Sequence, residues 1–368
     1  MRVKFFDIAE QTKMLSDELE AAVLSVLESG QYILGPRVQT FETRFAEFIG
    51  TKYAVGVGSG TDALVISLRA LGIGPGDEVI VPSFTFYATA EAVANVGAKA
   101  VFADVDVETM NITAEHIAKK LTKATKAVIP VHLFGLSAPM NEIMELADQK
   151  GIFVIEDVAQ ATGATCNGIK AGSFGDMAAF SFFPTKNLAA AGDGGAITTN
   201  SEELATKARK LRNHGSIKRY RNEMLGYNSR LDAIQAVVLT VRLGYIQTFI
   251  DLRRRNAEKY REMLSDIEQI ALPKEPDGLF HTYNQFTIRV LDGRRDELRK
   301  FLASKGIETM VYYEVPVHRL EPFAGNYDDS QLPNTMLLCS QVLSLPIFPE
   351  LTSSELEYVA YSIREFFK

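Results

Sequence analysis

The sequence predicts an α/β protein of two domains, the larger built on a mainly parallel β-sheet. From about residue 50 to residue 158, short apolar runs alternate with segments whose apolar residues recur at helical spacing. Such alternation is typical of parallel strands joined by helices that cover both faces of the sheet. After about residue 270 the pattern changes, and a chain of 368 residues is too long for one hydrophobic core. We therefore expect a large domain over residues 1–250, including an N-terminal arm, and a smaller α+β domain over residues 251–368.

The N-terminal region precedes the sheet. Residues 14–29 have apolar positions at helical spacing and are followed by Gly30, a common helix stop. The next segment, QYILGPRV (31–38), is predicted to be extended and interrupted by glycine.

The sheet region follows in a regular order. Its expected strands are YAVGVG (53–58), EVIVP (78–82), KAVFADV (99–105), KAVIPV (126–131) and IFVIEDV (152–158). The helices expected between them are TDALVISLRALG (61–72), TAEAVANVG (89–97), TAEHIAKKL (113–121) and PMNEIMELADQKG (139–151).

The remaining elements complete both domains. Two further strand-like runs, DMAAFSFF (176–183) and GGAITTN (194–200), precede a helix with a serine cap, SEELATKARKLRNHG (201–215). Residues 230–266 are predicted to form one long helix or two that connect the domains. The small domain is expected to hold the strand QFTIRV (285–290) and the helices RRDELRKFLASKG (294–306) and SSELEYVAYSIREFF (353–367).

Composition excludes several classes of protein. The net charge of −7 argues against a general nucleic-acid or anionic-membrane surface. No apolar run approaches the roughly 20 residues that span a bilayer, and the N-terminus has no signal-peptide pattern. Cys166 and Cys339 are far apart and, like the five dispersed histidines, lack metal-site spacing. We expect reduced thiols in a cytoplasmic protein with no metal, a disulfide being the alternative.

Lys186 is the first candidate catalytic residue. It lies in a short polar turn between an apolar run and a glycine-rich exit, within AAFSFFPTKNLAAAGDGG (178–195). The small residues that follow it allow a large flat ligand to approach. A desolvated lysine has a depressed pKa and can attack a carbonyl as the neutral amine, which suits an aldehyde cofactor held as a Schiff base. The alternative is a solvated loop lysine.

Asp157 is the second candidate. It ends the apolar strand-like run VIED, and ligands of open α/β sheets bind outside the carboxyl ends of the strands. A carboxylate there can keep a pyridine nitrogen protonated, because a nearby opposite charge favours the charged form. A protonated ring then acts as an electron sink. The alternative is that Asp157 caps a helix formed by the AQAT segment.

A phosphate site is predicted at GVGSGTDAL (56–64), which follows a strand and opens a helix. Backbone N–H groups at a helix start bind phosphate, and Ser59 and Thr61 add hydroxyls. Ser181, five residues before Lys186, is a second candidate donor. The rival interpretation, a dinucleotide fingerprint, fits poorly because the spacing is G-x-G-x-G rather than G-x-G-x-x-G.

Two further segments offer binding groups. PSFTFYATAE (82–91) supplies aromatic rings, one of which could stack on a planar ligand, although at least one is expected in the core. In GYNSRLDAIQA (226–236), Asn228 and Arg230 could bind phosphate or carboxylate, the alternative being a capped helix start with a surface arginine. The run Arg253–Arg255 is interpreted as a solvated helix face, or otherwise as a contact for nucleotide phosphate.

These motifs together resemble the DegT/DnrJ/EryC1/StrS sugar aminotransferases. The resemblance runs over nearly the whole chain, through QYILGPRV, SGTDAL, PGDEVIVPSFTFYAT, VIEDVAQA, SFFPTKNL, GDGGAI, RNHG, GYNSRLDAIQA and MVYYEVPVH. It implies the pyridoxal-phosphate fold type I, similar to aspartate aminotransferase, with a mainly parallel seven-stranded sheet in the large domain and a smaller C-terminal α+β domain.

The resemblance also implies the roles of individual residues. Lys186 would bind pyridoxal 5'-phosphate covalently and later move protons, and Asp157 would pair with the ring nitrogen. The other implied cofactor contacts are Gln160 to the ring hydroxyl, Phe86 over the ring face, and Gly60, Thr61 and Ser181 around the phosphate. Asn228 would reach the phosphate of a neighbouring subunit, so the active unit would be a homodimer with shared sites. The segments that match the family's sugar site contain Gln31, Tyr32, Arg230, Tyr312, Tyr313 and His318.

The implied reaction moves an amino group from glutamate to a keto-sugar carried on a nucleotide. The form GYNSRL is most similar to members that act at C3, which favours a dTDP-3-keto-6-deoxyhexose, the alternative being a UDP-linked 3-keto-sugar or a 4-keto-sugar. A related sugar dehydratase is disfavoured because those relatives carry histidine where Lys186 stands. A non-catalytic sensor remains a rival, and a nicotinamide-dependent dehydrogenase is disfavoured by the glycine spacing.

Overall fold

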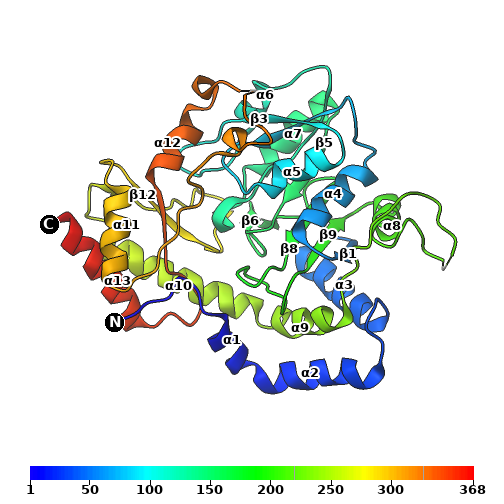
Figure 1. Ribbon diagram of the computed structural model, residues 1–368, viewed down its shortest axis with the longest axis horizontal. Helices are drawn as coiled ribbons and strands as arrows, with labels where there is room; N and C mark the ends of the chain where they lie inside the picture. Colours follow the sequence, from blue (N-terminus) through cyan, green and yellow to red (C-terminus); the bar gives the residue numbers. More distant parts are fainter. Residues whose placement is uncertain (219, 326) are drawn as a thin grey trace.

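A twisted β-sheet forms the centre of the computed structural model, which describes residues 1–218, 220–325 and 327–368 (Figure 1). Within these residues the sheet has seven strands in the order β1-β9-β8-β5-β4-β2-β3. The pairs β2–β3, β2–β4, β4–β5 and β5–β8 are parallel, whereas β9 runs antiparallel to β1 and β8. The predicted mainly parallel seven-stranded sheet is therefore confirmed. Its strands are β1 (Tyr53–Val57), β2 (Glu78–Pro82), β3 (Lys99–Ala103), β4 (Thr125–Val128), β5 (Phe153–Asp157), β8 (Met177–Ser181) and β9 (Gly195–Thr199).

Helices cover both faces of this sheet because successive strand residues point to opposite sides. Val55 of β1 packs with α4 and α8, whereas its neighbour Ala54 packs with α3 and α9. The helices on them are α3 (Pro36–Ile49), α4 (Gly60–Ala70), α5 (Ala88–Asn95), α6 (Ala114–Ala118), α7 (Met140–Lys150), α8 (Glu202–Leu211) and α9 (Ala233–Leu243).

The C-terminal region has its own core. It surrounds a three-stranded sheet in the order β10-β12-β13, and Val3 from the N-terminus joins it through a bridge to Ile307. The elements are β10 (Ile270–Ala271), β12 (Phe286–Val290), β13 (Val342–Leu345), α10 (Ile246–Leu264), α11 (Arg295–Ser304), α12 (Pro333–Gln341) and α13 (Ser353–Phe367). Because α10 runs continuously through residue 250, the division at 250/251 falls inside a helix and stays a proposal.

The smaller elements link these parts. The third sheet pairs β11 with β6 and β6 with β7, and α1 and α2 form the N-terminal arm along the lower edge of Figure 1. The bounds are α1 (Ile8–Met14), α2 (Ser16–Ser29), β6 (Thr165–Cys166), β7 (Ile169–Lys170), β11 (Leu279–Phe280), and the 3₁₀ helices η1 (Leu133–Gly135), η2 (Val317–Arg319) and η3 (Asp329–Gln331).

Two local expectations are refined by the structure. The segment 31–38 is not extended throughout, because α3 begins at Pro36, whose fixed φ suits the first position of a helix. Residues 230–266 contain two helices, α9 and α10, with a 60° bend between them. Within residues 1–218, 220–325 and 327–368, no single helix is long and apolar enough to cross a membrane, and α9 with α10 would be so only as a bent pair, by length and composition.

Candidate active site

The predicted catalytic groups meet at the carboxyl ends of β5 and β8. Asp157 is the last residue of β5, Ser181 is the last of the parallel neighbour β8, and Lys186 follows in the loop to β9. The turn before α4 lies against the same edge, since a Cβ built on Gly60 would stand 2.7 Å from the Cβ of Ser181. Only glycine permits this approach, so the helix start and the strand end form one cradle.

Asp157 is a buried carboxylate held from two sides. The Thr89 hydroxyl donates to Oδ2 at 2.9 Å, and the backbone N–H of Ala159 donates to Oδ1 at 3.2 Å. Its side chain is 5 % exposed, and burial raises its pKa against the opposing effect of these hydrogen bonds and of the Lys186 charge. No helix follows Asp157, so the alternative role as a helix cap is wrong.

Lys186 is partly buried in the loop between β8 and β9. Burial lowers its pKa from 10.5 to about 8, and the attraction of Asp157 limits the shift. No acceptor for its ammonium is found among the described residues. The side chain is therefore an amine of reduced basicity within the electrostatic influence of a buried carboxylate, an arrangement that suits reaction with a carbonyl.

Gln160 links this edge to the C-terminal region. Its Oε1 accepts a hydrogen bond from the backbone N–H of Phe134 at 2.9 Å, and its Nε2 donates to the Tyr313 hydroxyl at 2.9 Å. Burial raises the pKa of Tyr313, so its hydroxyl stays protonated. The family resemblance implied separate roles for Gln160 and Tyr313, and the structure brings the two side chains into contact.

Unsatisfied backbone donors mark the start of α4. Ser59 caps the helix by accepting from the N–H of Asp62 at 3.1 Å, which leaves the N–H groups of Gly60 and Thr61 without an acceptor among the described residues. The Ser181 hydroxyl accepts from the N–H of Phe183 at 3.3 Å and can still donate its own proton. These donors converge where an anion such as phosphate can bind.

The two phenylalanines of the segment 82–91 differ in burial. Phe84 is buried, as expected for at least one ring of this segment, and Phe86 is 57 % exposed. The Phe86 ring centroid lies 6.3 Å from that of Tyr313, and Tyr312 lies 5.7 Å from Tyr313. Phe86 therefore has a free face for a planar ligand beside the two tyrosines.

The other candidate residues lie outside this cluster or face other partners. Asn228, Gln31 and Tyr32 are exposed, while Arg230 is partly buried and donates to Oδ1 of Asn213 at 2.9 Å. Of the three arginines at 253–255, Arg255 alone is exposed, because Arg253 is buried against backbone carbonyls and Arg254 pairs with Glu275.

His318 has both ring nitrogens engaged inside the chain. Its Nδ1 lies 2.6 Å from the Ser83 hydroxyl and its Nε2 lies 2.9 Å from Oδ1 of Asp329. The contact with Ser83 spans 235 residues, so no local pattern could have indicated it.

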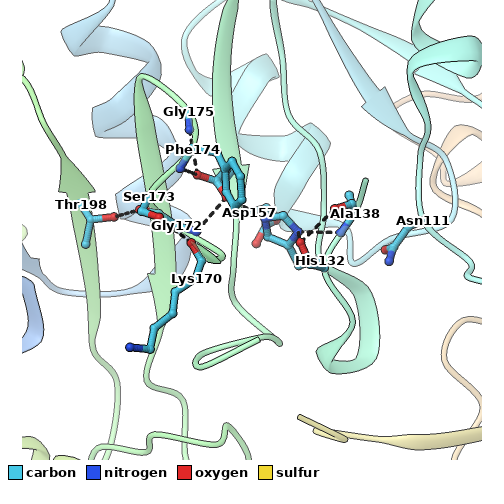
Figure 2. A network of polar contacts seen from close by, with 12 residues as sticks. Asn111, His132, Ala138, Asp157, Lys170, Gly172, Ser173, Phe174, Gly175 and Thr198 are labelled. Carbon is cyan, nitrogen blue, oxygen red and sulfur yellow. Dashed lines mark hydrogen bonds and ion pairs between the residues drawn. The ribbon is translucent and has the colours of Figure 1, made fainter. Parts of the chain in front are cut away.

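A buried network behind Asp157 was missed by the sequence analysis. Glu156 accepts from the N–H groups of Gly172, Phe174 and Gly175 at 2.7–2.9 Å. His132 completes the network, with Nε2 3.1 Å from Glu156 and Nδ1 accepting from the N–H of Ala138 (Figure 2). Because Nδ1 is an acceptor, the ring proton sits on Nε2 and is donated to Glu156. The sequence did contain one indication of this network. Consecutive residues of a strand point to opposite faces of the sheet, so Glu156 must point to the face opposite that of Asp157.

Known proteins resemble this chain along its whole length. The family model described as "DegT/DnrJ/EryC1/StrS aminotransferase family" matches residues 13–364. A "Pleiotropic regulatory protein" of Geobacillus stearothermophilus is 44% identical, covering 100% of this chain and 99% of the relative. The UDP-N-acetyl-3-dehydro-alpha-D-glucosamine 3-aminotransferase of Acidithiobacillus ferrooxidans is 46% identical over 98% and 97%. The dTDP-3-amino-3,4,6-trideoxy-alpha-D-glucose transaminase of Streptomyces venezuelae is 43% identical over 99% and 96%.

Solved structures agree with this family. The crystal structure of S. venezuelae DesV in complex with a ketimine intermediate superposes with a TM-score of 0.97 at 42% identity, covering 100% of this chain and 99% of that one. The fold predicted from the sequence, that of pyridoxal-phosphate aminotransferases, is therefore confirmed.

Proposed function

The chain belongs to the DegT/DnrJ/EryC1/StrS aminotransferase family, and from this premise we propose that it moves an amino group from glutamate to a nucleotide-linked 3-keto-sugar. The observation that carries this proposal is the pairing of an amine whose pKa is lowered to about 8, on Lys186, with the buried Asp157 carboxylate at one sheet edge. A merely structural lysine gains nothing from that placement, because burial without an ion pair costs folding free energy.

The residues at this edge fit pyridoxal 5'-phosphate. Asp157 is a buried carboxylate without a direct ion pair, and a protonated ring nitrogen would provide one. The free N–H groups of Gly60 and Thr61, together with the Ser181 hydroxyl, suit a phosphate group. Phe86 offers an exposed ring for stacking. When bound, the cofactor supplies an aldehyde that takes up amino groups and a ring that withdraws electrons from the adjacent carbon.

The chain's own groups then have distinct tasks. The Nζ atom of Lys186 would hold the cofactor and, as a free amine, would carry a proton between two carbon atoms. The Asp157 carboxylate would keep a proton on the ring nitrogen. Gln160 would address the ring hydroxyl from a position fixed by Phe134 and Tyr313. Burial of this edge limits access of water, which strengthens each of these interactions.

The sugar would bind on the side of Tyr312 and Tyr313. We assign Gln31, Tyr32, Arg230 and His318 to the same substrate region as proposals, with His318 acting through its contacts to Ser83 and Asp329. The two relatives that act on 3-amino sugars favour C3 as the aminated carbon. One of them carries UDP and the other dTDP in its name, so both nucleotides are candidates, and we prefer a dTDP-3-keto-6-deoxyhexose.

We further propose that the active unit is a homodimer in the cytoplasm. Asn228 is exposed and thus available to a second copy. An apolar groove of about 1060 Å³ lies between α1, α2 and the loop after Lys186, and it exposes Leu24 and Leu27. A second copy would cover this groove. Cys166 and Cys339 are both free and buried, which is compatible with a reducing compartment.

One spectroscopic experiment tests the function. Purified protein loaded with pyridoxal phosphate is mixed with dTDP- and UDP-linked 3-amino and 4-amino sugars, and bleaching of the cofactor band reports amino transfer. We expect bleaching by a 3-amino sugar, none in Lys186→Ala, and normal behaviour in the exposed control Lys126→Ala. Failure of every sugar to bleach the band in the wild-type protein would favour the second candidate, a regulatory role like that named for the Geobacillus relative.

A further inference from the structure

Side chains of helix α9 form hydrogen bonds with the loop that carries Lys186, and we call these contacts the grip. Two polar side chains of that helix, Gln235 and Arg242, reach the same short stretch of loop backbone, residues 189–191. They are seven residues apart, close to two helical turns, so both lie on one face of α9. Neither residue touches the catalytic cluster itself.

Gln235 pairs with the backbone of Ala191 as a neighbouring strand would. Its Oε1 accepts from the N–H of Ala191 at 2.8 Å, and its Nε2 donates to the carbonyl of Ala191 at 3.3 Å. The Gln235 side chain thereby satisfies both the backbone N–H and the backbone carbonyl of Ala191. The loop needs such a partner because its backbone here lies outside any strand.

Arg242 holds the residues just before Ala191. Its Nη1 donates to the carbonyls of Ala189 and Ala190 at 2.8 and 3.5 Å, and its Nη2 donates to the Thr12 hydroxyl of α1 at 3.2 Å. The side chain is 4 % exposed, and no carboxylate forms an ion pair with it among the described residues. Burying an arginine without an ion pair costs folding free energy. We take the hydrogen bonds that Arg242 makes to the loop, which an apolar residue could not make, as the reason for an arginine here.

The grip has a short path to Lys186. The N–H of Ala190 donates to the carbonyl of Phe182 at 2.7 Å. This hydrogen bond closes the segment 182–190 into a loop, and Lys186 lies at the middle of that segment. Asn187 and Leu188, which lie between Lys186 and the gripped residues, are buried and have little room to adjust. A displacement of residues 189–191 would therefore be transmitted to Lys186.

We propose that Gln235 and Arg242 are positioning residues for Lys186, and that Arg242 extends this control to helix α1 through Thr12. The proposal rests on the proposed function, in which the Lys186 amine must reach two carbon atoms in turn. Proton transfer is sensitive to such placement, since a shift of about 1 Å can cost on the order of 100-fold in rate.

Backbone hydrogen exchange tests the grip without any cofactor. Gln235→Met removes both hydrogen bonds to Ala191 at nearly constant side-chain size. Gln247→Met is the matched control, because Gln247 is exposed and its side chain bonds, among the described residues, to Asp251 alone. We expect exchange of peptides covering residues 187–193 to rise at least tenfold in Gln235→Met and to be unchanged in Gln247→Met. Equal exchange in the two variants would overturn the grip.

Kinetics of the loaded enzyme test the positioning role. We expect kcat to fall about 100-fold in Gln235→Met with KM changed less than threefold, because the binding groups stay in place. Arg242→Met should lower kcat in the same way. If it does not fold, Arg242→Lys, which keeps the charge but loses the planar guanidinium, and Thr12→Val are milder variants. A melting temperature that drops in these variants while kcat and loop exchange stay at wild-type values would show that they only stabilise the fold.

The two proposals fail in distinguishable ways. If the wild-type protein transfers no amino group, the proposed function is wrong while the exchange result still reports the grip. If the wild-type protein is active and Gln235→Met matches it in kcat, the positioning role is wrong and the function stands.

Discussion

The side chain of Gln160 donates a 2.9 Å hydrogen bond to the hydroxyl of Tyr313, a residue 153 positions later in the chain. This contact ties the edge of the large sheet, three residues after Asp157, to the segment that precedes η2. It makes the two regions that enclose the proposed site depend on one another.

Tyr313→Phe should weaken that connection. The substitution leaves Nε2 of the buried Gln160 without an acceptor, and an unsatisfied buried donor costs about 1–3 kcal/mol. We expect this loss in the free energy of unfolding, measured by urea denaturation. A double-mutant cycle with Gln160→Met should give a coupling of about 1 kcal/mol. Additive effects of the two substitutions would show that the hydrogen bond contributes nothing.

The Lys186 amine should react at lower pH than ordinary lysines. Since burial lowers its pKa from 10.5 to about 8, half of the Lys186 amines are neutral near pH 8. We expect the rate of labelling by a small amine-specific reagent, followed by mass spectrometry on cofactor-free protein, to rise with a midpoint near pH 8. The exposed Lys126 serves as the internal reference. A labelling rate at Lys186 that kept rising well above pH 8 would show that burial does not lower its pKa.

Asp157→Asn should separate stability from catalysis. Burial raises the pKa of Asp157, so the folded protein binds this proton more tightly than the unfolded chain does, and the ionised carboxyl weakens folding at neutral pH. The cofactor-free variant should therefore be more stable than wild type at pH 7, with the difference shrinking as the pH falls toward 3.8, the ordinary value. The loaded variant should keep the cofactor but lose about 100-fold or more in rate. An unchanged rate would mean that another group protonates the ring.

Glu156→Gln should destabilise the protein strongly despite the small change. Glu156 accepts hydrogen bonds from three backbone N–H groups and from Nε2–H of His132. In a glutamine, the side-chain NH₂ group would replace one acceptor oxygen and would face these N–H donors. We expect a loss of about 3 kcal/mol in unfolding free energy, against almost none for the exposed control Glu142→Gln. Equal stability of the two variants would remove the structural role of this network.

Mixed dimers should reveal shared sites. If Asn228 of one subunit serves the site of the other, a mixture of inactive Lys186→Ala and Asn228→Ala subunits will contain one intact site per hybrid dimer. We expect mixing to restore up to about a quarter of wild-type activity, measured after subunit exchange, since random pairing makes half of the dimers hybrid and each hybrid has one intact site of two. Absence of any recovery in verified hybrid dimers would place each site within one subunit.

The sequence by itself determined the sheet and its catalytic ends. Alternating strands and helices fixed the mainly parallel architecture, because hydrophobic periodicity is a local property of the chain. The positions of Asp157, Ser181 and Lys186 near strand ends followed from the same local pattern and from the family resemblance. Helix α3 was missed where glycine and proline suggested extended chain, although proline suits the first helical turn.

Only the tertiary structure decided which side chains meet across long separations. Gln160 with Tyr313, Ser83 with His318, and Arg242 with the Lys186 loop join parts of the chain that no local pattern relates. The same holds for pKa, since the shift at Lys186 arises from burial and from Asp157, which depend on packing of the whole sheet edge. The sequence states which side chains are present, whereas the solvation of each side chain and its contact partners depend on the folded structure.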